Sequence, residues 1–176
     1  MRILIISVNH QIQPAQILSM STDGKLEAFE REQKETFGSF VKSNILERGV
    51  QFIAEEARHG QETVIERLCG LNNWGYANIE MTPEERTARQ IPPGYNEDQN
   101  LSETEKARCH REREEYMVER ILGEVGDAAS ILIICGRIHT APLADRFREL
   151  DHSVETTDLQ DENWYIEDWD QHMIDL

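Results

Sequence analysis

The sequence predicts an α/β fold, a three-layer sandwich in which helices cover both faces of a mostly parallel central sheet. Short apolar runs rich in β-branched residues are typical of strands that are buried on both faces. They alternate with amphipathic stretches of about ten or more residues, the length that a parallel crossover needs. A chain of 176 residues also suffices for one hydrophobic core. We expect about four to five strands, at residues 2–8, 50–54, 76–79, 130–135 and 153–156.

The first half of the chain predicts a strand followed by two helix–strand pairs. Residues 2–8 form a continuous apolar run, whereas residues 26–48 carry apolar side chains at helical spacing. Gly49 ends this helix, because glycine readily adopts the left-handed conformation that follows a helix C-terminus. Residues 61–69 predict a second, shorter helix that ends at Gly70.

Residues 82–101 interrupt this alternation of strands and helices. Thr82 begins a capped helical turn, and the prolines at 92–93 then prevent regular structure. A connection of this length in a small domain is typical of a lid, a binding loop or an insert, and we expect it to cover a crevice. Residues 102–126 predict a long charged helix, and residues 141–150 predict the last helix.

The chain is strongly acidic, with 34 Asp and Glu residues against 18 Lys and Arg and a formal net charge of −16. Residues 151–176 contain nine acidic side chains and no Lys or Arg. A negative protein repels nucleic-acid phosphates and anionic lipids, which disfavours both as general partners. We divide the chain into one α/β domain at residues 1–157 and an acidic tail at residues 158–176. The aromatic residues of the tail, such as Trp164 and Trp169, are expected to dock on the body or on a second copy, so a homo-oligomer is compatible with the sequence.

The sequence also bears on the cellular compartment. No apolar run reaches the length of a membrane-spanning helix, and the apolar start is too short for the core of a signal peptide. We therefore expect a cytoplasmic protein. The three cysteines, Cys69, Cys109 and Cys135, are odd in number and lack C-x-x-C spacing. This pattern disfavours a disulfide framework and a structural zinc site, and it favours buried, reduced thiols.

Ionisable side chains come directly after the predicted strands. In an open parallel sheet, ligands bind outside the carboxyl ends of the strands, so these residues are candidates for a site. Any one of them can be an ordinary solvated loop residue. Two histidines together with paired carboxylates at separate strand ends predict one shared site. The residues delivered there are His10, Glu55, Glu56, Glu80 and His139.

The local sequence predicts the surroundings of the two neighbouring glutamates and of His139. Glu55 and Glu56 point to opposite sides if they extend their strand, so one faces the crevice and the other enters a helix layer. A carboxylate in an apolar layer is costly unless it is paired, so one of the two needs a cationic or metal partner, whereas both are solvated if the strand ends a residue earlier. His139 precedes Thr140, an expected N-cap, and the helix N-terminus favours a neutral imidazole that suits a general base or a metal ligand. Gly136 permits close approach of the backbone to a ligand.

Glu114 lies within the apolar stripe of the long charged helix. At helical spacing it falls on the same face as Met117 and Ile121. Either this position lies near the helix entrance, where the stripe has left the core, or the carboxylate is paired inside, with Arg111 or Arg113 as a partner. We favour the entrance and keep Glu114 as an additional candidate for the site.

These strand-end residues resemble the motifs of the erythromycin-esterase/ChaN-like superfamily, which includes the TIKI and TraB proteins. Members carry a Gly-x-x-His motif after a strand near each end of an α/β domain, with acidic residues between. Residues 136–139 (Gly-Arg-Ile-His) match the second motif, residues 7–10 (Ser-Val-Asn-His) occupy the place of the first, and residues 55–56 that of the acids. Ser7 and Asn9 depart from the pattern, in place of a glycine and an acid. The resemblance implies an α/β fold and an esterase or protease activity that is metal-dependent in some members, or haem binding in others.

The leading hypothesis is a small hydrolase that acts on a small-molecule or peptide substrate. P-loop, GxGxxG, GxSxG and HExxH motifs are absent, so nucleotide chemistry and a serine-hydrolase mechanism lack support. A carboxylate or a neutral histidine would deprotonate a water, with a divalent metal on His10, Glu56 and His139 as one option. A cation would stabilise the developing oxyanion, and the candidates are Arg86, Arg113 and Arg137.

Two alternatives are compatible with the same residues. The first is a non-catalytic binding module of the same fold, which would hold a small ligand in the crevice and engage a basic partner through the acidic tail. The second is a degenerate family member whose first motif has decayed, as Ser7 and Asn9 suggest.

Overall fold

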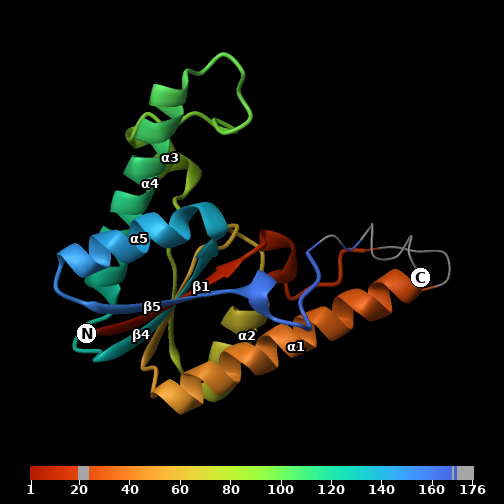
Figure 1. The fold of residues 1–176 in the computed structure, drawn as a ribbon. Coiled ribbons are helices and arrows are strands. Elements are labelled where there is room, and N and C mark those ends of the chain that lie inside the picture. The colour runs from red at the N-terminus through yellow and green to blue at the C-terminus, as the bar shows by residue number, and fades with distance from the viewer. Residues whose placement is uncertain (20–23, 168, 170–176) are drawn as a thin grey trace.

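The computed structural model describes residues 1–19, 24–167 and 169 and confirms the three-layer α/β fold (Figure 1). All five strands of the described chain run parallel in one sheet, in the order β3-β2-β4-β1-β5. Strand β4 therefore lies at the centre, between β2 and β1. The strands are β1 (Arg2–Val8), β2 (Phe52–Glu55), β3 (Gly75–Asn78), β4 (Ser130–Gly136) and β5 (Ser153–Asp158).

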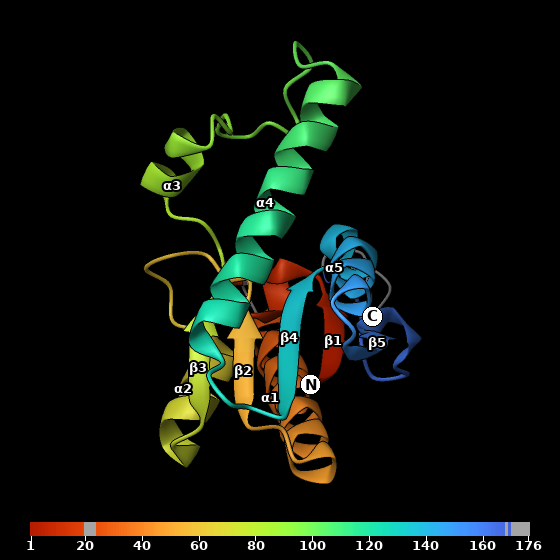
Figure 2. The same ribbon diagram turned by 90° about the vertical axis from the view of Figure 1, so that its left-hand side faces the viewer.

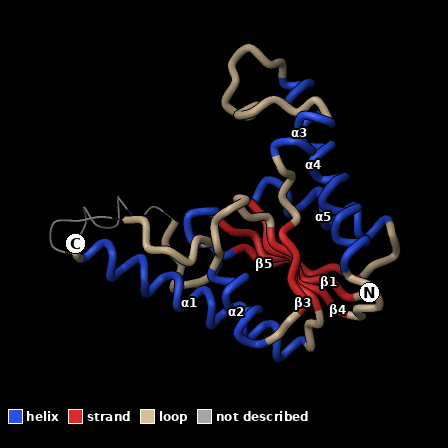
Figure 3. Tube along the Cα trace, turned by 180° about the vertical axis from the view of Figure 1, so that it is seen from behind, coloured by secondary structure: helices blue, strands red, loops and turns tan. Residues whose placement is uncertain are grey.

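Helices cover both faces of the sheet, as Figures 2 and 3 show. Strand β1 illustrates the reason, because Leu4 and Ile6 belong to the core shared with α1 and α2, whereas Ile3 and Ile5 belong to the core shared with α4 and α5. Successive side chains of a strand point to opposite faces, so an entirely apolar strand supplies both cores. The helices are α1 (Lys25–Arg48), α2 (Val64–Asn72), α4 (Glu103–Glu124) and α5 (Arg137–Glu149).

The strand register aligns the residues that follow each strand. Val8 at the end of β1 pairs with Gly136 at the end of β4, and Glu55 at the end of β2 pairs with Ile134. The chain leaves β1 and β2 toward the face of α1 and α2, but it leaves β4 toward α5 on the opposite face (Figure 2). Connections that diverge in this way leave a crevice outside the carboxyl ends of the strands.

The expected loop at residues 82–101 begins with a short helix, α3 (Pro83–Ala88). The Thr82 hydroxyl accepts a hydrogen bond from the Glu85 N–H at 3.2 Å, and the Glu85 carboxylate accepts one from the Thr82 N–H at 2.8 Å. Beyond α3 the segment is irregular, but Tyr95 is buried against α4. The segment is therefore anchored to α4 beside the carboxyl ends of the strands.

The described part of the predicted acidic tail packs against the body. A short 3-10 helix, η2 (Leu159–Asp161), follows β5, and Tyr165 and Trp169 are buried in the core on the α1 side. The Gln33 amide of α1 also donates a hydrogen bond to the Trp164 carbonyl at 2.9 Å. These aromatic residues thus dock on the body of the same chain. Residues 168 and 170–176 of the predicted tail lie outside the described residues.

Two further expectations concern thiols and membrane spans. The three cysteines are buried and free, as the sequence predicts. Among the helices of the described ranges, none combines the length and the apolar composition needed to cross a lipid bilayer.

Candidate active site

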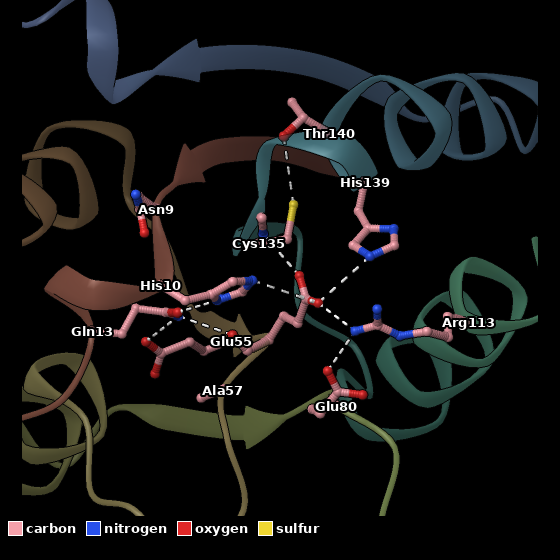
Figure 4. Close-up of polar contacts among 12 residues, drawn as sticks. Asn9, His10, Gln13, Glu55, Ala57, Glu80, Arg113, Cys135, His139 and Thr140 are labelled. Atoms are coloured by element: carbon pink, nitrogen blue, oxygen red, sulfur yellow. Dashed lines mark hydrogen bonds and ion pairs between the residues drawn. The ribbon is translucent and has the colours of Figure 1, made fainter. Parts of the chain in front are cut away.

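The residues that follow β1, β2 and β4 line one crevice at the carboxyl edge of the sheet, with a volume of about 870 Å³. Helix α4 and the segment at 82–101 complete its walls. Figure 4 shows His10, His139 and Arg113 directed from three different elements toward one point. That point is the carboxylate of Glu56, the first residue after β2. The ionisable side chains that line the crevice are His10, Glu56, Arg58, His59, Glu80, Arg86, Arg113 and His139.

Glu56 is the buried anion of the crevice. Only 2% of its surface is exposed, yet its pKa lies below the ordinary value of 4.5. Burial by itself would raise the pKa, but attraction to the two histidines and Arg113, together with the Gly136 N–H, outweighs that effect. The Arg113 guanidinium lies 2.6 Å from Oε1, and the Gly136 N–H donates a hydrogen bond to Oε2 at 2.8 Å. Both carboxylate oxygens are therefore held in place.

His10 begins a 3-10 turn, η1 (His10–Ile12), and its side chain is 55% exposed. Its Nδ1 lies 2.6 Å from Gln13 Oε1. Two acceptors orient the Gln13 amide, because Nε2 donates to Glu55 Oε1 and to the Glu56 main-chain carbonyl, both at 2.9 Å. Gln13 Oε1 must therefore accept, so His10 Nδ1 carries the proton. In the neutral ring, the lone pair is then on Nε2, 3.9 Å from Glu56 Oε1.

His139 meets the same carboxylate from the start of α5, with 1% of its surface exposed. Its Nδ1 lies 3.2 Å from Glu114 Oε1, so this carboxylate orients the ring and Nδ1 carries the proton. Its Nε2 has no hydrogen-bond partner among the described residues and lies 3.6 Å from Glu56 Oε1. Two imidazoles thus present Nε2 to one carboxylate oxygen.

The structure corrects two expectations at this point. Helix α5 begins at Arg137 with Gly136 as its N-cap, so the prediction that Thr140 is the N-cap is wrong. His139 consequently lies inside the first helical turn instead of before it. The interpretation of Glu114 as a residue of the helix entrance is also wrong, because its carboxylate is buried. A carboxylate inside the protein needs a donor, and His139 supplies it in place of the expected arginine.

Glu55 points away from the crevice, into the layer of α2, and is fully buried. It accepts hydrogen bonds from the Thr63 hydroxyl at 2.6 Å, from the Tyr76 hydroxyl at 2.9 Å and from the Gln13 amide at 2.9 Å. Burial raises its pKa to about 7, and these hydrogen bonds offset only part of the rise. Glu55 and Glu56 point to opposite sides, as expected, and the expected cationic partner is Arg113 at Glu56, whereas Glu55 has three neutral donors. Glu55 reaches the crevice only through Gln13, as a positioning residue.

The three candidate arginines differ in what they contact. Arg113 of α4 is buried between two carboxylates, with its guanidinium 2.6 Å from Glu56 and 2.5 Å from Glu80. Arg86 of α3 contacts the other oxygen of Glu80 at 2.9 Å and lines the crevice. Arg137 lies outside the crevice lining and pairs with acidic residues of the C-terminal segment. Arg86 is therefore the candidate that a bound substrate can contact.

Gly136 meets the expectation of a close approach. A Cβ atom added there would lie 2.7 Å from His10 Nε2 and 3.5 Å from Glu56 Oε2. The backbone of β4 thus forms part of the wall against which the His10 ring lies. Ser7, in the place of the other expected glycine, is buried, and its hydroxyl has no hydrogen-bond partner among the described residues.

Gln13 is the residue that the sequence did not indicate. It is buried and joins His10 to Glu55. In the sequence it lies in a polar stretch after the first strand, where the neighbouring residues are equally polar. Its spacing of three residues from a strand-end histidine is a signal too common to single it out.

The predicted metal ligands His10, Glu56 and His139 converge, but their surroundings do not suit a divalent cation. Both oxygens of Glu56 are occupied, one of them by the fixed positive charge of Arg113. A cation bound at this oxygen would be repelled by the guanidinium. Within the described ranges, no group of three or more His, Cys, Asp or Glu side chains is arranged to hold an ion. The geometry does not support the metal prediction.

Comparison with known proteins returns no relative: no protein-family model, curated protein or solved structure matches the chain.

Proposed function

We propose that the crevice is the active site of a hydrolase in which His10 acts as a general base on a water molecule. The observation that carries the proposal is the distance of two imidazole Nε2 atoms from one oxygen of Glu56, 3.9 Å for His10 and 3.6 Å for His139. Both separations are too long for a direct hydrogen bond, and beside the half-exposed His10 ring a water can donate one hydrogen to His10 Nε2 and the other to Glu56 Oε1. With Nδ1 protonated, His10 presents the Nε2 lone pair to that water.

His10 is the better base because it can reach a substrate. Its side chain is half exposed in the crevice, whereas His139 is buried. A general base must lie within hydrogen-bond reach of the proton that it takes, in the presence of the substrate. His139, held by Glu114 and buried at Nε2, is instead a positioning residue that lies against the Glu56 carboxylate.

The reaction follows from these positions. The water oxygen attacks the carbonyl carbon of an ester or amide, its proton passes to His10 Nε2, and the carbonyl oxygen becomes an oxyanion. The bond to the leaving group then breaks, and His10 returns the proton to that group. Gln13 keeps the imidazole in the productive tautomer, and the negative charge of Glu56 stabilises the transient imidazolium. Arg86 supplies the positive charge for the oxyanion.

The test is hydrolysis of a panel of para-nitrophenyl esters, thioesters and fluorogenic peptides by the purified protein. We expect His10→Gln to lower kcat/KM by about a hundredfold to ten-thousandfold, and His139→Gln to lower it by about tenfold or more. His152→Gln is the matched control, because His152 lies between α5 and β5, outside the crevice. Wild-type rates in both crevice variants refute the proposal.

Two further readouts separate the proposal from its alternatives. Hydrolysis that a chelator abolishes and a divalent ion restores would show that the metal-free mechanism is wrong. A wild-type protein that binds the panel in equilibrium measurements but hydrolyses none of it would instead be a binding module. The resemblance to the erythromycin-esterase/ChaN-like superfamily favours hydrolysis, and the geometry supports it independently.

A further inference from the structure

The crevice has the opposite charge to the rest of the chain. Three arginines and two glutamates line it, which gives a formal charge of +1 in a protein of net charge −16. A cleft that is lined by one sign of charge concentrates ligands of the other sign. The lining groups that carry these fixed charges are Glu56, Glu80, Arg58, Arg86 and Arg113.

Neither of the two glutamates is available to a ligand. Both oxygens of Glu56 are occupied by Arg113 and by a main-chain N–H. In Glu80, Oε1 lies 2.9 Å from the Arg86 guanidinium and accepts a hydrogen bond from the Met81 N–H at 2.7 Å, while Oε2 lies 2.5 Å from Arg113. The negative charges of both glutamates are therefore paired within the wall of the crevice, and the charge left facing its interior is positive.

Arg58 carries that remaining charge. It follows β2, its side chain is exposed on the crevice, and it forms no ion pair or side-chain hydrogen bond with any residue of the described ranges. Other exposed arginines, such as Arg67 and Arg148, pair with a carboxylate. Arg31 and Arg111 also have no such partner among the described residues, but neither of them lines the crevice. An unpaired guanidinium on a crevice retains its full set of donors for a ligand.

The turn that carries Arg58 is braced. The neighbouring His59 ring lies 2.7 Å, through Nε2, from the Glu80 carbonyl oxygen. On the other side, the Asn78 amide donates to the Ala57 carbonyl at 2.8 Å and accepts from the Ala57 N–H at 3.3 Å. A turn tied on both sides to the end of β3 holds Arg58 at the crevice, which lowers the entropy lost on binding.

We propose that the crevice takes a substrate that carries a carboxylate or phosphate group, bound by the guanidinium of Arg58. Arginine is suited to this task because its planar guanidinium can bind both oxygens of such a group. Apolar side chains of the same crevice, Met81, Ile91 and Ile138, contact the hydrocarbon part of the substrate. That the bound molecule is a substrate rests on the proposed function, whereas anion binding by the crevice is inferred from these charges alone.

The kinetic test compares two esters with acyl chains of equal length, the mono-para-nitrophenyl ester of glutarate and para-nitrophenyl valerate. We expect wild type to favour the anionic ester by about tenfold in kcat/KM, and Arg58→Gln to remove that preference by lowering kcat/KM on the anionic ester about tenfold more than on valerate. Arg111→Gln removes an exposed arginine of α4 outside the crevice lining and should keep the preference. An Arg58→Gln variant that loses equally on both esters, or on neither, overturns the proposal.

The binding test does not depend on hydrolysis. Glutarate, its neutral diamide and inorganic phosphate are titrated into wild type, Arg58→Gln and Arg111→Gln at constant ionic strength. We expect glutarate or phosphate to bind wild type and Arg111→Gln about tenfold more tightly than Arg58→Gln, and the diamide to bind none of them measurably. The tighter of the two anions identifies the group. Equal binding in all three proteins refutes anion recognition, while anion binding without ester hydrolysis refutes only the proposed function.

Discussion

Replacing Glu55 with glutamine tests how the interior of the sheet tolerates a carboxyl group. The side chain is fully buried and receives hydrogen bonds from Thr63, Tyr76 and Gln13. Glutamine has the same shape and keeps one oxygen for these donors, and the two hydroxyls can turn to accept from its amide. The substitution therefore removes the titration of the group with little change in packing.

The magnitude follows from two pKa values. Burial raises the pKa of Glu55 from 4.5 to about 7 in the folded protein. Below about pH 4.5 the carboxyl is protonated in the folded and the unfolded chain alike, so stability does not depend on this group. Between about pH 4.5 and 7 the unfolded chain releases its proton while the folded protein keeps it, so the free energy of unfolding falls as pH rises. Above about pH 7 the loss is complete, at about 3 kcal/mol.

Urea unfolding of wild type and Glu55→Gln from about pH 4.5 to pH 8 measures this effect, because the contributions of all other groups cancel in the difference. We expect the free energy of unfolding of wild type to fall by about 3 kcal/mol relative to the variant across this window. Glu47→Gln, which removes an exposed carboxylate of α1, controls for the deletion of one acid. A difference between wild type and Glu55→Gln that stays constant with pH refutes the raised pKa.

Two further predictions concern the walls of the crevice. Gly136→Ala brings a Cβ to 2.7 Å from His10 Nε2, so the half-exposed ring must move. We expect ester hydrolysis to fall by about tenfold to a hundredfold while urea unfolding changes by less than about 1 kcal/mol; an unchanged rate contradicts the assigned position of the base. Arg113→Met leaves two buried carboxylates without their shared cation, and we expect it to lower the free energy of unfolding by about 3–5 kcal/mol at neutral pH. A loss below about 1 kcal/mol in the same urea assay shows that Arg113 is not needed to hold those charges.

The fold was predictable because burial on both faces leaves a signal in the sequence. A strand between two helix layers must be apolar at every position, and the runs at 2–8 and 130–135 predict the two longest strands on that basis. The weaker strands shifted by a residue or two. The second, expected at 50–54, is Phe52–Glu55, and this shift places Glu55 inside the strand and Glu56 just beyond it. The alternation along the strand decides which of the two enters the layer of α2, because Glu55 shares the face of Ile53 and Glu56 that of Ala54.

Helix boundaries were less predictable near the site. Thr140 has the chemistry of an N-cap, but α5 has already begun when the chain reaches it. At the actual start of α5, the Gly136 N–H donates a hydrogen bond to the Glu56 carboxylate. This contact joins distant segments of the chain, so local sequence preference does not predict it. The environment of Glu114 was predicted wrongly for a similar reason. Its partner, His139, belongs to another helix, so the sequence of α4 does not show it.

The sequence by itself determined that His10, Glu56 and His139 lie at one edge of the sheet, because parallel strands bring their carboxyl ends together whatever their order. Only the tertiary structure decided what each of them contacts. Arg113 reaches Glu56 across 57 residues of chain, from a helix whose rotation and depth against the sheet are set by packing. The tautomers of the two histidines, the neutral donors around Glu55 and the unpaired charge of Arg58 depend on such placements, and no local pattern encodes them.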